Sequence, residues 1–103
     1  MSLNNIEKLI RSALPGLTEL RHDLHEYPEL GYEETRTSAR IANELTKLPG
    51  LTVQTGLADT GIVAVLGADK PEPCVALRAD MDALPIQEQS NKNYASKVPG
   101  KMH

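Results

Sequence analysis

The chain has 103 residues, of which 40% are hydrophobic and 24% charged, so we expect it to fold as one small domain. This length excludes a two-domain enzyme, and a formal net charge of −3 gives no electrostatic reason to bind nucleic acid or an anionic membrane. Because three tyrosines are present without Phe or Trp, either the core is small and aliphatic or the chain is part of something larger.

The cysteine content and the absence of long apolar runs indicate a cytoplasmic protein. Cys74 is the single cysteine, which excludes an internal disulfide, and we expect it to be a small buried strand residue. No run approaches the roughly 20 apolar residues of a membrane span, and the first ten residues are amphipathic rather than signal-like.

Two helices are predicted in the first half of the chain. Apolar residues recur every three or four positions between Asn4 and Tyr27, which predicts a helix with one buried stripe. Pro15 should kink this helix or begin a second one. A further helix is expected from about Glu33 to Leu48, where the sequence Pro-Gly follows and stops it.

Three strand signals come next: "LTVQTG" from Leu51, "GIVAVLG" from Gly61 and "CVALRA" from Cys74. The sequence "ADTG" suits a hairpin connection between the first two. The second and third runs are apolar at nearly every position, which is typical of strands buried on both faces, so helices should cover both sides of the sheet. Two helices followed by three strands predict an α/β fold, with a long polar loop after Pro85.

Asp80 and Asp82 follow the third predicted strand and are separated by one residue. If the chain stays extended there, both carboxylates point to one face, together with Arg78. Carboxyl ends of strands in open α/β sheets are common ligand sites. The pair could share a divalent metal, orient a ligating imidazole, or be neutralised by Arg78.

His22 and His25 lie three positions apart, near each other on the first predicted helix. A structural role in a hydrogen-bonded network at the helix end, with Arg21 and Glu29, is the simpler interpretation. A small metal-binding module would instead combine these histidines with the two aspartates, Asp80 and Asp82.

Three stretches together resemble one family: "LRHDLHEYPELGYEE", then "TGIVAVLG" followed by "VALRADMDALPIQE", and finally "GKMH". In this order and spacing they resemble the start of the hippurate hydrolase and auxin-conjugate amidohydrolase branch. This branch belongs to the two-metal aminoacylase and carboxypeptidase (peptidase M20) superfamily. The resemblance runs from Leu17 to His103.

The resemblance implies that residues 1–103 are the N-terminal part of a metallohydrolase catalytic domain with a dizinc-peptidase-like α/β fold. The rest of that domain, and a lid domain that often dimerises into a homo-oligomer, would be absent. The implied reaction is hydrolysis of the amide bond of a small N-acyl amino acid, with two divalent metal ions (Zn, Mn or Co) in the intact enzyme and none bound by this segment alone.

Carried over to this sequence, the family pattern assigns supporting roles to the two aspartates. Asp82 matches the aspartate that orients a metal ligand, whereas Asp80 stands where carboxypeptidase-like members have a ligand histidine, so it supports the site with Arg78. The main ligands are expected just after His103, in a stretch reading A-C-G-H-D. The segment alone should therefore be inactive. The alternative is a self-contained, truncated homologue that acts as a non-catalytic interaction module.

Overall fold

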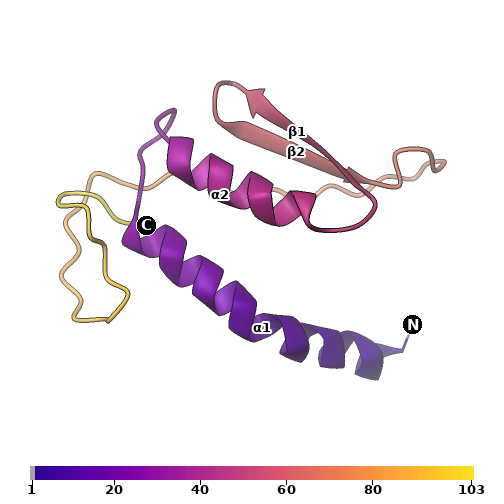
Figure 1. Ribbon diagram of the computed structural model, residues 1–103, viewed down its shortest axis with the longest axis horizontal. Coiled ribbons are helices and arrows are strands. Elements are labelled where there is room, and N and C mark those ends of the chain that lie inside the picture. Colours follow the sequence, from indigo (N-terminus) through magenta and orange to yellow (C-terminus); the bar gives the residue numbers. More distant parts are fainter. Residues whose placement is uncertain (1) are drawn as a thin grey trace.

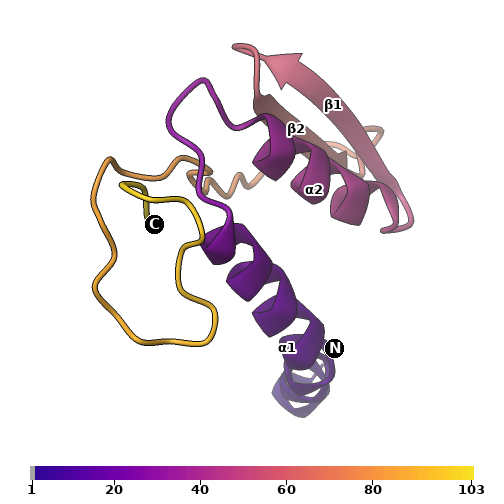
Figure 2. The ribbon, with the colours of Figure 1, turned by 60° about the vertical axis from the view of Figure 1, so that its left-hand side comes forward.

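The computed structural model describes residues 2–103 and contains two helices and two strands. In chain order these are α1 (Leu3–Glu26), α2 (Thr35–Thr46), β1 (Leu51–Leu57) and β2 (Gly61–Leu66) (Figure 1). In Figures 1 and 2, α2 lies between α1 and the β1–β2 hairpin. The α/β arrangement is thus confirmed, but with two strands rather than the three that the sequence predicts. Neither helix in this part of the chain is long and apolar enough to cross a membrane.

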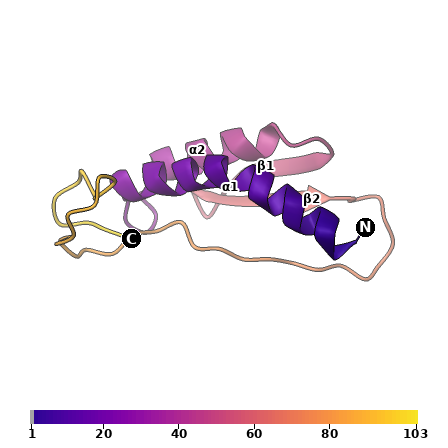
Figure 3. The same cartoon turned by 90° about the horizontal axis from the view of Figure 1, so that it is seen from below.

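Helix α1 begins at a capping serine and continues through Pro15. The Ser2 hydroxyl accepts a hydrogen bond from the Asn5 N–H at 3.4 Å, as an N-cap residue does. The helix changes direction near its middle, in agreement with the predicted kink at Pro15 (Figures 1 and 3). No residue of α1 is buried, and its apolar stripe is exposed, with Leu9 at 58% and Leu17 at 56%.

Strands β1 and β2 form an antiparallel hairpin that packs against α2 on one face. Its connection is the predicted "ADTG" turn, in which Ala58 and Asp59 have positive φ angles of 47° and 73°. Such values suit the tight turns that match the twist of paired strands. Gly61 is required after the turn, because a Cβ there would lie 2.5 Å from the Leu57 carbonyl oxygen.

The third predicted strand is not confirmed, and its predicted burial is not found in the described residues. In the described residues the run from Cys74 to Ala79 pairs with no other segment. Val75 and Leu77 are 87% and 98% exposed, and Cys74 is exposed rather than buried. The expectation of helices on both faces of the sheet is not met either, since among residues 2–103 only α2 covers the hairpin. A strand needs a hydrogen-bonded neighbour, and this part of the chain supplies none for the run.

Residues 85–103 form the predicted irregular loop, which returns to the end of α1 (Figure 1). Leu84 and Met102 exchange two backbone hydrogen bonds, of 2.8 and 3.1 Å, and this isolated bridge closes the loop. The best-buried side chains are Pro28 in the α1–α2 turn, Thr37 in α2 and Ala83 just before the loop.

Candidate functional site

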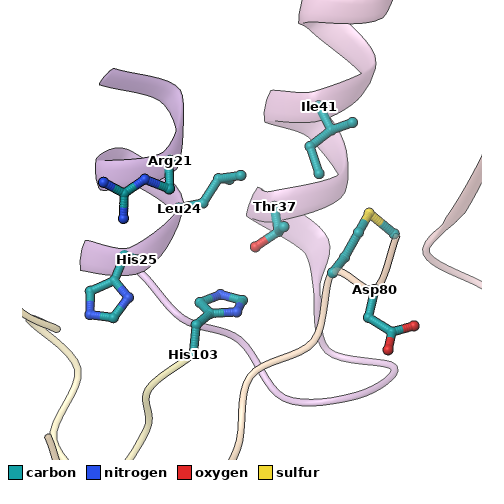
Figure 4. Close-up of a pocket in the computed structure, with 8 residues that line it drawn as sticks. Arg21, Leu24, His25, Thr37, Ile41, Asp80 and His103 are labelled. Atoms are coloured by element: carbon teal, nitrogen blue, oxygen red, sulfur yellow. The ribbon is translucent and has the colours of Figure 1, made fainter. Parts of the chain in front are cut away.

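A cleft of about 220 Å³ opens where the end of α1, the start of α2, the stretch after the predicted third strand and the C-terminal residue meet (Figure 4). It is lined by Arg21, Leu24, His25, Thr37, Ile41, Asp80, Met81 and His103. The cleft therefore brings together residues from four separated parts of the sequence, including several that the sequence analysis names as candidate site residues.

Backbone hydrogen bonds fix the walls of this cleft. The Ala83 N–H donates to the Glu29 carbonyl oxygen at 2.8 Å, which attaches the stretch around Asp80 and Asp82 to the turn between the helices. The adjacent Leu84–Met102 bridge then brings His103 to the same place. The site is thus positioned mainly by main-chain contacts between segments far apart in the sequence.

Glu29 caps the start of α2, although it lies outside that helix. Its carboxylate accepts the Arg36 N–H at 3.1 Å and the Thr37 N–H at 2.6 Å. These are the second and third helical residues, whose N–H groups have no partner within the helix. Burial acts to raise the pKa of Glu29, but the hydrogen bonds from Thr37 and Arg36 outweigh it and lower that pKa. Glu29 therefore serves α2, not the histidine network in which it was expected.

The two helix-end histidines take part in a network of hydrogen bonds and ring contacts at the end of α1, as the simpler interpretation expects. His25 Nε2 lies 2.8 Å from Glu88 Oε1, whose side chain is only 5% exposed. The same carboxylate accepts the Ser96 N–H at 2.8 Å and the Ser90 hydroxyl. The Ser90 hydroxyl, then the Ser96 N–H and His25, lower the pKa of Glu88. This charged group anchors the 85–103 loop to α1.

His22 contacts the same loop through its ring. It stacks on Tyr94 with 3.7 Å between ring centroids, and Arg21 Nη2 lies 3.2 Å from its Nε2. The Arg21 guanidinium also lies 5.6 Å from the centre of the Tyr94 ring. These contacts confirm that Arg21 belongs to a network at the end of α1.

Asp80 and Asp82 line two adjoining clefts, which have Met81 in common. Asp80 lines the cleft of His25 and His103, but its carboxylate turns away from both imidazoles (Figure 4). It pairs instead with Arg78 at 2.7 Å, the neutralising contact that the sequence left open. Asp82 lines a neighbouring cleft of about 280 Å³, between the α1–α2 turn and the hairpin turn. The stretch thus presents one carboxylate to each cleft.

His103 brings a further imidazole to the first cleft. Its ring centroid lies 6.4 Å from that of His25, and both rings border the cleft (Figure 4). Partial burial, followed by the charge of His25, lowers the pKa of His103, while Asp82 acts in the opposite direction. The imidazole is therefore favoured in its neutral form, which can accept a hydrogen bond.

These residues do not form a metal site by themselves. Within residues 2–103, no group of three or more His, Cys, Asp or Glu side chains is placed to hold a metal ion. His25 is bound to Glu88 and Asp80 to Arg78, so two of the donors in question already have partners. The metal-binding module of His22, His25, Asp80 and Asp82 is therefore not assembled.

The long-range contacts of two acids were missed at the sequence level. Glu88 binds His25 across 63 positions, and no local pattern indicates that pairing. Glu34, 7% exposed, accepts the Thr60 hydroxyl at 3.0 Å and so connects α2 to the hairpin turn. Its position at the N-terminal end of the predicted helix was a usable signal for a role at that end.

The chain is similar to several known hydrolases, although no family model matches it. It is 43% identical over 107 residues to YhaA of Bacillus subtilis, a protein named as a putative amidohydrolase. This match covers 100% of the chain and 27% of YhaA. It is 50% identical over 84 residues to IAA-amino acid hydrolase ILR1-like 5 of Arabidopsis thaliana, with 82% of this chain and 19% of the relative covered.

The fold of the chain is also similar to that of a solved structure. The crystal structure of Bacillus subtilis YxeP, described as a dinuclear metal binding peptidase of the M20 family, matches with a TM-score of 0.78 and 38% identity. The match covers 90% of this chain and 26% of YxeP. The chain thus spans about a quarter or less of the length of these proteins. Sequence and fold agree that the chain belongs to the M20 family of amidohydrolases and dinuclear metal peptidases, as a homologue of one segment of them.

Proposed function

We propose that this chain forms the N-terminal part of the catalytic domain of a cytoplasmic, metal-dependent amidohydrolase that cleaves N-acyl amino acids. The observation that carries the proposal is the 50% identity over 84 residues to a hydrolase named for IAA-amino acids, a match long enough to include both aspartates. A non-catalytic interaction module has no comparable support, since the relatives are enzymes by name.

In this proposal the described residues build one wall of the active site. Two divalent ions, Zn, Mn or Co, would lower the pKa of a bound water and stabilise the developing oxyanion, and their main ligands would come from residues beyond this chain. Asp82 would orient one of those ligands by accepting its N–H. Asp80, held by Arg78, would support the same strand end, and Glu29 would keep both in place through Ala83.

A chimera tests the proposal. The matched segment of the Arabidopsis hydrolase is replaced by the corresponding residues of this chain, and hydrolysis of IAA-amino acids is measured with Zn, Mn or Co added. We expect the chimera to be active, to lose activity with a chelator, and to regain it with metal. The 103-residue chain alone should show no turnover. A folded chimera without activity, or metal-dependent turnover by the chain alone, would contradict the proposal.

Substitutions in the chimera separate the roles of the two aspartates. We expect Asp82→Asn to lower kcat/KM by roughly 10- to 100-fold, the usual effect of losing a group that orients a metal ligand. Asp80→Asn should have less effect, because its carboxylate pairs with Arg78 on the surface. Asp69→Asn, in the exposed turn after the hairpin, is the control. Equal losses at all three positions would refute these assignments.

A further inference from the structure

The carboxylate of Glu88 is the point where the 85–103 loop is attached to helix α1. One of its oxygens, Oε1, lies 2.8 Å from His25 Nε2 and accepts the Ser96 N–H at 2.8 Å, and the other accepts the Ser90 hydroxyl. Only 5% of the side chain is exposed. Burying a carboxylate is unfavourable unless it is paired, and an apolar residue is often as stabilising at such a position. Stability alone therefore gives no reason for an acid here.

Ser96 extends this attachment to the end of the loop. Its N–H is bound by Glu88, while its hydroxyl donates to the Lys101 carbonyl oxygen at 2.7 Å and accepts the Val98 N–H at 3.2 Å. The Lys101 N–H donates to the Val98 carbonyl oxygen at 3.3 Å, which closes the turn between them. His25, Glu88, Ser96 and Lys101 thus form a continuous series of hydrogen-bonded groups, here called the loop relay, from α1 to the residue two positions before His103.

Two attachments together fix the direction of residues 101–103. The first is the pair of backbone hydrogen bonds between Leu84 and Met102, which by itself holds the chain at one point. The loop relay holds the neighbouring residue and supplies a second point. His103 follows directly, and its ring borders the first cleft together with that of His25, with 6.4 Å between the ring centroids (Figure 4).

We propose that Glu88 is a positioning residue of the active site, which acts through Ser96 to set the direction in which the chain continues beyond His103. The inference rests on the proposed function, in which the main metal ligands come just after His103, and it adds which group aims them. Glu88 itself contacts neither metal nor substrate in this arrangement. Ligands must be placed within a few tenths of an ångström to bind a metal ion well, so loss of the carboxylate should act on their placement.

Hydrogen exchange in the isolated chain tests the positioning without a metal or a reaction. Glu88→Gln keeps the size of the side chain but removes its charge, so the Met102 N–H, which donates to the Leu84 carbonyl oxygen, should exchange about 10-fold faster. Amides of the β1–β2 hairpin should keep their rates. Glu19→Gln, the same change at an exposed position of α1, is the control and should alter neither. An unchanged rate at Met102 would overturn the inference, as would equal acceleration in the hairpin, which indicates a general loss of stability.

Metal affinity tests the consequence for the active site. In the chimera described above, titrated with Mn²⁺ in a calorimeter, Glu88→Gln should raise the metal dissociation constant by roughly 10-fold, the lower end of the usual effect of disturbing the surroundings of a ligand. The KM for the substrate, measured at saturating metal, should stay unchanged, as should both constants in Glu19→Gln. A residue that only stabilises the loop would lower the unfolding midpoint and leave the metal affinity of the folded chimera as it was, and that result would refute the positioning role.

A second substitution shows whether Glu88 acts through Ser96. Ser96→Ala removes the hydroxyl that holds Lys101 but keeps the N–H that Glu88 binds, so it should weaken metal binding in the same way. The double variant should bind Mn²⁺ no more weakly than the more affected single variant, as expected for two members of one series, whereas additive losses would contradict the loop relay. Should Glu88→Gln fail to fold, Ser96→Ala decides by the same measurements.

The two measurements also separate this inference from the proposed function. A folded chimera with Glu88 intact but without metal-dependent turnover would refute the proposed function, and exchange at Met102 in the isolated chain would still decide whether Glu88 positions the residues before His103. An active chimera whose metal affinity is unaffected by Glu88→Gln would refute this inference alone.

Discussion

Removing the Glu29 carboxylate should destabilise the chain more than any other single charge deletion near the cleft. Glu34 occupies the N-cap position of α2 but makes no capping bond, so the two free N–H groups depend on Glu29. Loss of an N-cap side chain lowers the free energy of unfolding by about 0.5–2 kcal/mol. Because the charged carboxylate of Glu29 accepts two hydrogen bonds, we expect Glu29→Ala to lower it by about 1.5 kcal/mol. At roughly 4–8 °C per kcal/mol for a domain of this size, the unfolding midpoint should fall by about 6–12 °C.

The effect should depend on pH in a defined direction. The pKa of Glu29 in the folded chain lies below its usual value of 4.5. Its stabilising contribution is therefore fully present above pH 4.5 and is lost as the pH falls through the lowered pKa. Circular dichroism at 222 nm, followed during heating at pH 7 and at pH 3, measures both effects. The difference between wild type and Glu29→Ala should shrink at pH 3.

A neighbouring carboxylate is the control for this prediction. Glu33 is an exposed acid at the same end of α2, and its carboxylate makes no hydrogen bond within the described residues. Glu33→Ala should therefore change the free energy of unfolding by no more than about 0.5 kcal/mol. If Glu33→Ala costs as much as Glu29→Ala, the stabilisation is a general charge effect at the helix end, and the capping argument fails. An unchanged midpoint for Glu29→Ala at pH 7 would refute it directly.

Three other substitutions have expected outcomes set by single contacts. His25→Ala removes the bond to Glu88, so the Ser96 amide in the anchored loop should exchange about 10-fold faster with solvent; an unchanged rate would show that the loop does not depend on this contact. Gly61→Ala should destabilise the hairpin by at least about 1 kcal/mol, because its Cβ would meet the Leu57 carbonyl at 2.5 Å. Gly16→Ala should stabilise α1 by about 0.5–1 kcal/mol, since nothing lies within 4 Å of the added methyl group. Effects of the same sign for both glycines in urea unfolding would contradict the local geometry.

Local signals predicted the helices and the hairpin well. The predicted bounds of Asn4–Tyr27 and Glu33–Leu48 differ from α1 and α2 by one or two residues at each end. The Pro15 kink and the "ADTG" turn follow from the conformational limits of a few residues, which act whatever surrounds them. The family resemblance rested on short motifs of the same local kind.

Long-range features were beyond such signals. The run from Cys74 has the composition of a buried strand, but pairing and burial need neighbouring segments, and residues 2–103 supply none for it. The same limit applies to the surroundings of Asp80 and Asp82, because the stretch that carries them is attached to the α1–α2 turn by the hydrogen bond from the Ala83 N–H to the Glu29 carbonyl oxygen. The sequence of a segment predicts which conformation it favours, whereas its pairing and burial depend on the segments that it contacts.

The bend in α1 also divides the molecule into parts of unequal stability. Pro15 leaves twelve helical residues on its N-terminal side, and none of α1 is buried. Isolated helices of fewer than about 12–15 residues are only marginally stable in water, so the half of α1 before Pro15 should have little helical stability of its own. The half after Pro15 is secured through His25 and Glu26, which bind Glu88 and Lys97 of the loop. Heating should thus unwind the first three turns before the rest of the chain, and the proline marks the border between the two melting units.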